Sequence, residues 1–186
     1  DLTADPLRFW TPAELLAAIP AQRKPVGVES EYGNVNYLLL GMVIEEVTGR
    51  PVAKVLRDGV LGIDGVERLI YQPDEVPTQP IAIENGQSAA WHKSMGGFLP
   101  SIAYTSDRAA AAMASDSVSL ARWWRALCAG EIVSQASLTA MMPTTDSYGF
   151  GIGDDWNISG AVGHGGSDLD GNAMAGCLPE SGVVFA

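Results

Sequence analysis

The chain has 186 residues, of which 47% are hydrophobic, so it can bury the core of one ordinary domain. Its net charge of −11 argues against a nucleic-acid partner, because such a partner requires a basic surface. No apolar run approaches the roughly 20 residues that a membrane-spanning helix needs, so we expect no transmembrane segment in this chain.

The first predicted element is a short helix through residue 19. Thr11, Pro12, Ala13 and Glu14 form a capping box with proline at the first helical position. A loop at residues 20–30 follows.

The stretch at residues 31–51, EYGNVNYLLLGMVIEEVTGRP, predicts the central helix. Asn34 is the predicted N-cap, Gly49 lies just past the end, and Pro51 prevents continuation. Tyr32 and Asn34 therefore stand at the entrance of a helix, either as site residues or as a packed aromatic and a cap. Apolar residues at helical spacing predict a buried face made of Val35, Leu38, Leu39, Met42, Val43, Ile44 and Val47.

A second helix is expected from residue 51 to about residue 57, then a turn at residues 59–65 and a short strand at residues 68–71. Residues 72–105 predict a long loop, and long loops are often functional. Trp91, His92 and Lys93 could line a pocket there, although for His92 we favour a surface loop histidine.

Ser117 is the predicted N-cap of a helix through residue 127, with Gly130 just past its end and an apolar face of Leu120, Trp123, Trp124 and Leu127. A shorter helix at residues 135–142 ends at Pro143. Four short strands follow at residues 148–153, 161–165, 172–178 and 182–186, with a hairpin turn at residues 179–182.

Helices followed by an antiparallel meander indicate an α+β fold. We expect one composite domain, with a mostly helical part at residues 1–143 that includes the loop at 72–105, and antiparallel strands at residues 144–186.

The two cysteines, Cys128 and Cys177, are too few for a disulfide framework and lack the spacing of a metal site. One disulfide remains open, and we favour two buried thiols. No metal or other cofactor is expected.

A second candidate site lies at residues 162–167, where His164 is followed by Gly165, Gly166 and Ser167. Glycines lack a Cβ, so a ligand can approach the backbone, and two amides there could point at a carbonyl oxygen. The alternative is a glycine-rich turn with an incidental histidine. HGG also occurs in the oxyanion loop of α/β-hydrolases, but the G-x-S-x-G motif of that fold is absent.

Tyr32-Gly33-Asn34 and His164-Gly165-Gly166 resemble, in this order, the Y-x-N and H/K-x-G motifs of one family. This is the superfamily of serine β-lactamases, D-alanyl-D-alanine carboxypeptidases and esterases, of the class C type. The surrounding segments YGNVNYLLLGMVIEEVTGRP, MASDSVSLARWWRAL, YGFGIG and GHGGSDLDGNAMAGCLPESGVVFA are also similar to it, so the resemblance covers nearly the whole chain.

The resemblance implies a β-lactamase/DD-peptidase-like fold, with a helical part and part of an antiparallel sheet flanked by helices. The site would lie in the cleft between the two. The implied catalytic residues are Tyr32 and His164, and the implied substrate-binding residues are Asn34, Gly165, Gly166 and Ser167.

The implied reaction is hydrolysis of an amide or ester of a small-molecule or peptide substrate through an acyl-enzyme. His164 takes a position where many relatives carry lysine, and histidine titrates near pH 6.5. A substrate carboxylate would be held less firmly, which favours a D-amino-acid peptide or ester over a β-lactam. Relatives are often exported, so the resemblance implies a periplasmic or cell-envelope location.

The family's nucleophile is the serine of an S-x-x-K motif that precedes Y-x-N. None exists here, because the residues three before Lys24, Lys54 and Lys93 are Ala21, Pro51 and Ala90. We therefore expect an internal piece of the family's domain, inactive alone, that needs missing N- and C-terminal segments to complete the fold. The rival hypothesis is a non-catalytic pseudoenzyme or interaction module.

Overall fold

A computed structural model describes residues 8–19, 32–72, 74–75, 108–143, 147–154, 158–168 and 171–186. The helices are α1 (Pro12–Ala18), α2 (Asn34–Thr48), α3 (Val52–Asp58), the 3-10 helix η2 (Arg108–Ala110), α6 (Ser117–Cys128) and α7 (Gln135–Met141). The strands are β1 (Ile70–Tyr71), β2 (Met113–Ala114), β3 (Val162–Asp168), β4 (Gly171–Leu178) and β5 (Val183–Phe185). The predicted α+β class is confirmed.

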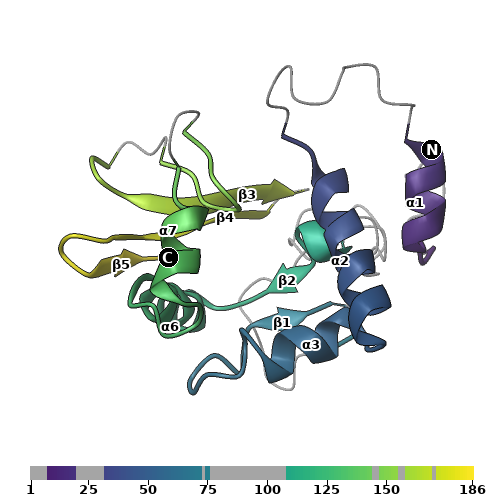
Figure 1. Ribbon diagram of the computed structural model, residues 1–186, viewed down its shortest axis with the longest axis horizontal. Coiled ribbons are helices and arrows are strands. Elements are labelled where there is room, and N and C mark those ends of the chain that lie inside the picture. Colours follow the sequence, from purple (N-terminus) through teal and green to yellow (C-terminus); the bar gives the residue numbers. More distant parts are fainter. Residues whose placement is uncertain are drawn as a thin grey trace.

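The elements form two groups with a small sheet between them (Figure 1). On one side, α6 packs against β4 and β5, which belong to an antiparallel sheet in the order β3-β4-β5. On the other side, α2 packs against α1, α3 and η2. The two-stranded antiparallel sheet β1-β2 lies between these groups. β3 is therefore an edge strand that can present its residues toward the α2 side.

Most predicted elements are present close to their expected bounds. The helices predicted at residues 51–57 and 135–142 agree with α3 and α7 within about one residue, as is usual for helix ends. The turn predicted at residues 179–182 joins β4 to β5 as an antiparallel hairpin. The loop at residues 20–30, and Trp91, His92 and Lys93 in the long loop, lie outside the described residues.

The strand predicted at residues 148–153 is wrong. The segment folds back on itself, with Tyr148 paired to Gly153 and the Gly149 N–H donating to the Ile152 carbonyl at 2.7 Å. Gly151 has a φ of 80°, which a glycine adopts without strain. A tight turn therefore replaces the strand and places Tyr148 at its start.

Helix α2 starts one residue earlier than predicted and ends where predicted. Gly33 occupies the N-cap position, and Asn34 is the first helical residue, so the predicted capping role of Asn34 is wrong. Gly49 ends the helix with a φ of 65°, as predicted for a glycine that stops a helix. The capping box of α1 is confirmed, because the Glu14 N–H donates to Thr11 Oγ1 at 3.3 Å.

The N-cap of α6 is Asp116, one residue before the predicted Ser117. The Asp116 carboxylate accepts a hydrogen bond from the Ser119 N–H at 2.7 Å. The predicted apolar face of α6 is confirmed, because Trp124 and Leu127 are buried in a core that also contains Leu138, Ile152 and Ala175. This core joins α6 and α7 to the sheet that carries β3.

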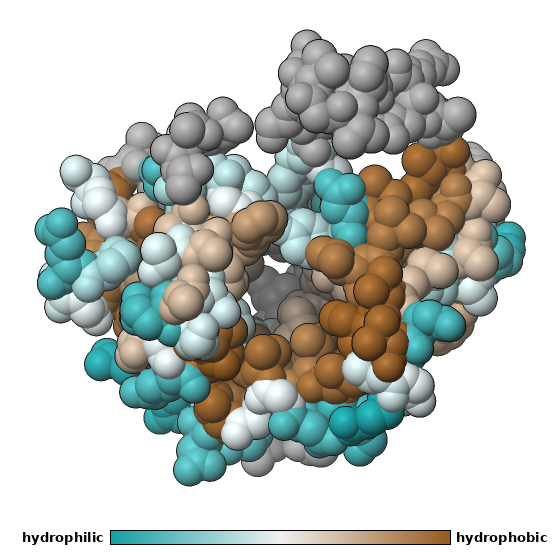
Figure 2. All heavy atoms as spheres, viewed as in Figure 1, coloured by the Kyte–Doolittle hydropathy of each residue, from teal (hydrophilic) through white to brown (hydrophobic). Residues whose placement is uncertain are grey.

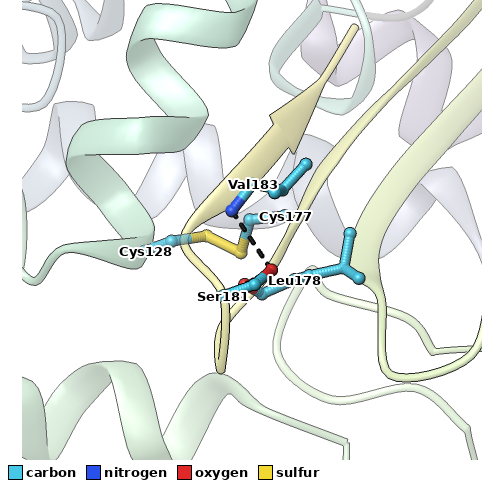
Figure 3. Close-up of a disulfide and its surroundings, with 5 residues drawn as sticks. All are labelled: Cys128, Cys177, Leu178, Ser181 and Val183. Carbon is cyan, nitrogen blue, oxygen red and sulfur yellow. Dashed lines mark hydrogen bonds between the residues drawn. A yellow bond between two sulfur atoms is a disulfide. The ribbon is translucent and has the colours of Figure 1, made fainter.

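A disulfide links Cys128 of α6 to Cys177 of β4, with the two Cα atoms 6.7 Å apart (Figure 3). The sequence-based preference for two free thiols is therefore wrong. The reason lies in the packing of α6 on the sheet, which brings together two residues separated by 49 positions. That distance falls within the range a disulfide requires, and the sequence alone does not contain it.

The apolar face predicted for α2 is buried only in part. Leu38 is buried, and Gly41 lies so close to η2 that a Cβ at Gly41 would meet the Ala109 Cβ at 2.8 Å. An outward stripe on the same helix is exposed, namely Leu39 at 43%, Leu40 at 54%, Val43 at 54% and Val47 at 78%. Figure 2 shows this apolar surface over α2, beside a hollow between the α2 side and the sheet side.

No helix in the described part of the chain is both long and apolar enough to cross a membrane.

Candidate active site

Tyr32 lies directly before α2, in the short extended segment that leads into the helix. Its side chain is 59% exposed, so it is available to a ligand. Asn34 is also exposed and begins the first turn of α2. The rigid helix that follows fixes the position of both residues, as expected for side chains that serve a site.

His164 lies on β3, opposite Ala175 of β4. Cross-strand partners share one face of a sheet, so the His164 side chain is on the face that carries the buried Ala175 and the disulfide-bonded Cys177. The His164 residue is only partly buried, so its ring remains accessible to contacts.

The structure brings Tyr32 and His164 together, although 132 positions separate them in the sequence. Their ring centroids are 6.3 Å apart, with an angle of 36° between the rings. The Tyr148 ring packs edge-on against both rings, at 5.5 Å from Tyr32 and 5.7 Å from His164. The two motifs therefore form one constellation rather than two unrelated features.

Hydrogen bonds connect this constellation to α2. The Tyr148 hydroxyl lies 2.9 Å from His164 Nε2 and 3.2 Å from the Tyr37 hydroxyl. Tyr37 belongs to α2 and His164 to β3, so the contacts span the helical side and the sheet side of the molecule.

The backbone of β3 offers amides to a ligand at its outer edge. Gly163 exchanges two hydrogen bonds with Gly153, at 2.9 and 2.7 Å, so its N–H and C=O point away from β4. Backbone groups alternate in direction along a strand, so the N–H groups of Gly165 and Ser167 point to the same outer edge. No strand in the described ranges pairs with β3 beyond Gly163 on that edge.

Glycine at position 166 leaves space above the strand. A Cβ placed on Gly166 would have no neighbour within 4 Å, so a ligand can approach the backbone here. Gly163, in contrast, is a packing glycine, because a Cβ there would lie 2.3 Å from the Ala175 carbonyl oxygen. The segment that follows His164 is thus open, exposed and lined with outward amides.

The two tyrosines that touch His164 are both neutral at pH 7. Burial raises the pKa of Tyr32, and the neighbouring Tyr37 adds to the increase. Burial also raises the pKa of Tyr148. None of the causes acting on Tyr32 is a cation. A cation would have to approach Tyr32 before the phenol could serve as a base at neutral pH.

Of the three lysines in the chain, only Lys54 is among the described residues, on the exposed side of α3. Its charge helps to lower the pKa of Glu75, and it is not among the causes that act on the pKa of Tyr32. Lys54 is preceded three residues earlier by Pro51, so it does not belong to an S-x-x-K motif.

Sequence reasoning missed Tyr37 and Tyr148. Tyr37 resembles any aromatic residue on an amphipathic helix, and Tyr148 opens a segment that the strand pattern explained. The YGFGIG segment contains a signal for this turn, because glycines such as Gly149 and Gly151 inside a strand pattern often mark a bend or a close approach of two backbone segments.

The chain belongs to the beta-lactamase family, because the family model described as Beta-lactamase matches residues 2–186. No curated protein sequence matches it. Among solved structures, the D-amino acid amidase from Ochrobactrum anthropi SV3, complexed with L-phenylalanine amide, is similar with a TM-score of 0.72 and 23% identity. The D-stereospecific amidohydrolase from Streptomyces sp. is similar with a TM-score of 0.69 and 24% identity.

These two similarities concern the fold, since the identities are low. They cover 97% and 98% of this chain, but only 56% and 57% of the two solved chains. The chain therefore spans little more than half the length of these structures.

Proposed function

We propose that this chain forms the tyrosine-bearing and strand-bearing half of a serine hydrolase active site that cleaves an amide or ester of a D-amino acid. The observation that carries the proposal is the juxtaposition of Tyr32 and His164, whose rings lie 6.3 Å apart beside an open glycine edge. Membership of the beta-lactamase family supports the reaction class. The names of the two structural neighbours support the D-amino-acid substrate.

The nucleophile in this proposal comes from a segment outside the 186 residues that carries S-x-x-K. The serine Oγ attacks the substrate carbonyl carbon, and its proton passes to the lysine and Tyr32 pair. Tyr32 then returns a proton to the leaving amine or alcohol, and an acyl-enzyme remains. Water attacks the acyl carbon, the serine leaves with a proton, and the carboxylic acid is released.

The outward amide of Ser167 is suited to the oxyanion of the tetrahedral intermediate. A donor of this kind is worth about 3–4 kcal/mol in the transition state. Asn34 would bind the acyl side chain of the substrate, and Gly165 and Gly166 would let the substrate lie along β3. His164 would face the substrate's polar end, and the cation that Tyr32 needs would be the incoming lysine.

The exposed stripe on α2 supports a docking place for the missing segment. A helix with apolar residues on two sides is normally packed against other elements on both sides. The stripe from Leu39 to Val47 is exposed instead. Tyr32 directly precedes this helix and is itself exposed. A segment that covers the stripe would therefore pass close to Tyr32, where the serine and lysine are needed.

The test compares this chain with the complete polypeptide encoded by its reading frame. Both are treated with a fluorophosphonate probe and assayed with D- and L-phenylalanine amide. We expect the complete polypeptide to be labelled on a serine and to prefer the D-amide, and this chain to remain unlabelled. Labelling of this chain alone would contradict the external nucleophile. A complete polypeptide that is not labelled would favour the non-catalytic alternative.

A further inference from the structure

Tyr148 is held by its backbone at the junction of α7 and β3. The turn that it begins is anchored to α7, because the Phe150 N–H donates to the Met141 carbonyl at 3.0 Å. A Cβ on Gly149 would lie 2.0 Å from that carbonyl oxygen, so only glycine fits this approach. The turn ends at Gly153, which exchanges two hydrogen bonds with Gly163 of β3. The Tyr148 side chain thus starts from a fixed point next to His164.

The Tyr148 hydroxyl is the only atom among the described side chains that bonds to both sides of the site. It lies 2.9 Å from His164 Nε2 on β3 and 3.2 Å from the Tyr37 hydroxyl on α2. Its ring also meets the Tyr32 ring edge-on at 5.5 Å with an angle of 89°. Edge-on packing of this kind is a favourable arrangement of two aromatic rings. One side chain therefore touches both residues to which the sequence motifs assign catalytic roles.

We propose that Tyr148 is a positioning residue of the site, which fixes the tautomer and orientation of His164 and, through its ring, the orientation of Tyr32. The proposal rests on the proposed function for its catalytic meaning. The contacts themselves exist in this chain and can be measured without activity.

The direction of the hydrogen bonds follows from the chemistry of the groups. A phenol has one hydrogen to donate, and a neutral imidazole has one donor and one acceptor nitrogen. The imidazole nitrogen is a stronger base than a phenol oxygen, so Tyr148 donates to Nε2 of His164 and the ring proton stays on Nδ1. Tyr37 then donates to the Tyr148 oxygen. The raised pKa of Tyr148 keeps this donor protonated at neutral pH.

This arrangement gives His164 a defined role in the unliganded site. With Nε2 engaged by Tyr148, the imidazole carries its own proton on Nδ1 and offers it as a donor. A fixed tautomer means that a substrate acceptor meets a hydrogen-bond donor without a preceding rearrangement of the ring.

The experiment measures the His164 tautomer by long-range ¹H–¹⁵N correlation NMR on the labelled 186-residue chain. The spectrum is recorded at about pH 8.5, two units above the ordinary histidine pKa. The chain has two histidines, so His92→Asn identifies the His164 signals. We expect one Nδ1–H tautomer in the unmutated chain. In Tyr148→Phe the tautomer ratio should shift toward Nε2–H by about fivefold or more, the effect of losing one ordinary hydrogen bond.

Two variants serve as controls. Tyr37→Phe removes the bond to Tyr148 but leaves the Tyr148 donor, so the His164 tautomer should be retained. Tyr71→Phe changes a buried tyrosine in the separate core with Val52 and Ala53, and should leave the His164 signals unchanged. An Nε2–H tautomer in the unmutated chain would overturn the proposal, and this result needs no variant to fold. An unchanged tautomer in a folded Tyr148→Phe chain would overturn it as well.

The result is separable from the proposed function. A confirmed tautomer together with an unlabelled complete polypeptide would retain the positioning contact and reject the hydrolase. Serine labelling together with the wrong tautomer would retain the hydrolase and reject the role of Tyr148.

Discussion

Helices α6 and α2 both carry apolar residues at helical spacing, but they bury them to very different extents. On α6, Leu127 is 2% exposed and lies in the core with Leu138 and Ala175. On α2, Leu40 is 54% exposed on an outward stripe. The spacing of apolar residues in a sequence therefore predicts that a helix has an apolar face. Which element covers that face is known only from the three-dimensional structure. For α6 that element is the sheet, and for α2 we propose a segment outside this chain.

The largest expected effect concerns the disulfide that fastens α6 to the sheet. Replacing both cysteines, Cys128→Ala with Cys177→Ala, should lower the free energy of unfolding by about 4 kcal/mol, because the bond closes a loop of 49 residues. Urea denaturation of the two chains measures this difference. Since the chain has two cysteines, no other thiol complicates the comparison. A loss below about 1 kcal/mol would mean that the disulfide does not stabilise the protein by reducing the entropy of the unfolded chain.

A matched pair of substitutions tests the two helix faces directly. Leu127→Ala should lower the free energy of unfolding by about 3 kcal/mol, because it leaves a cavity in a packed core. Leu40→Ala should change it by less than about 0.5 kcal/mol in this chain. Equal losses would mean that the α2 stripe is covered in solution.

The same Leu40→Ala substitution sharpens the comparison in the complete polypeptide. If a further segment covers the α2 stripe, the loss should rise to about 2 kcal/mol. A loss that stays near zero in the complete polypeptide would remove the support that the stripe gives to the proposed docking place.

A smaller effect concerns the N-cap of α6. Asp116→Ala should cost about 1 kcal/mol at neutral pH, and Ser117→Ala, the neighbouring control, less than about 0.5 kcal/mol. The Ser119 N–H that donates to Asp116 lowers the pKa of this carboxyl. Its stabilisation is therefore complete above the unfolded pKa of about 3.9, and is lost as the pH falls through the lower folded value.

The pH dependence provides the measurement for this cap. The difference in unfolding free energy between the unmutated chain and Asp116→Ala should be constant from about pH 5 to 7 and shrink toward pH 2. Asp116→Asn should keep most of the stabilisation, because asparagine is also a good N-cap. A difference that grows as the pH falls would contradict the assignment of Asp116.

The sequence predicts whether a segment is a helix or a strand better than it predicts which of two adjacent residues caps a helix. The capping errors at Asn34 and Ser117 have one cause, because in each case the adjacent residue can also start a helix. Gly33 and Asp116 occupy the cap positions instead. The alternation of Tyr148, Phe150 and Ile152 predicts a strand, but Gly151 adopts a positive φ of 80° and turns the segment back on itself.

The two motifs predict that Tyr32 and His164 share a site, and the structure places the two rings side by side. Tyr37 and Tyr148 could not be predicted in the same way. Their hydroxyl contact joins residues 111 positions apart, and it depends on how α2 and the turn before β3 are packed. The disulfide was missed for the same physical reason.

In the proposed function, Tyr32 transfers protons in a site completed by an external serine. The most direct test is the hydrolysis of D-phenylalanine amide by the complete polypeptide carrying Tyr32→Phe, with Tyr71→Phe as the control. We predict that kcat falls by about 100-fold or more for Tyr32→Phe while KM changes little, as expected when general acid–base catalysis is lost. An unchanged kcat for Tyr32→Phe would contradict the account and leave Tyr32 as a packed aromatic residue.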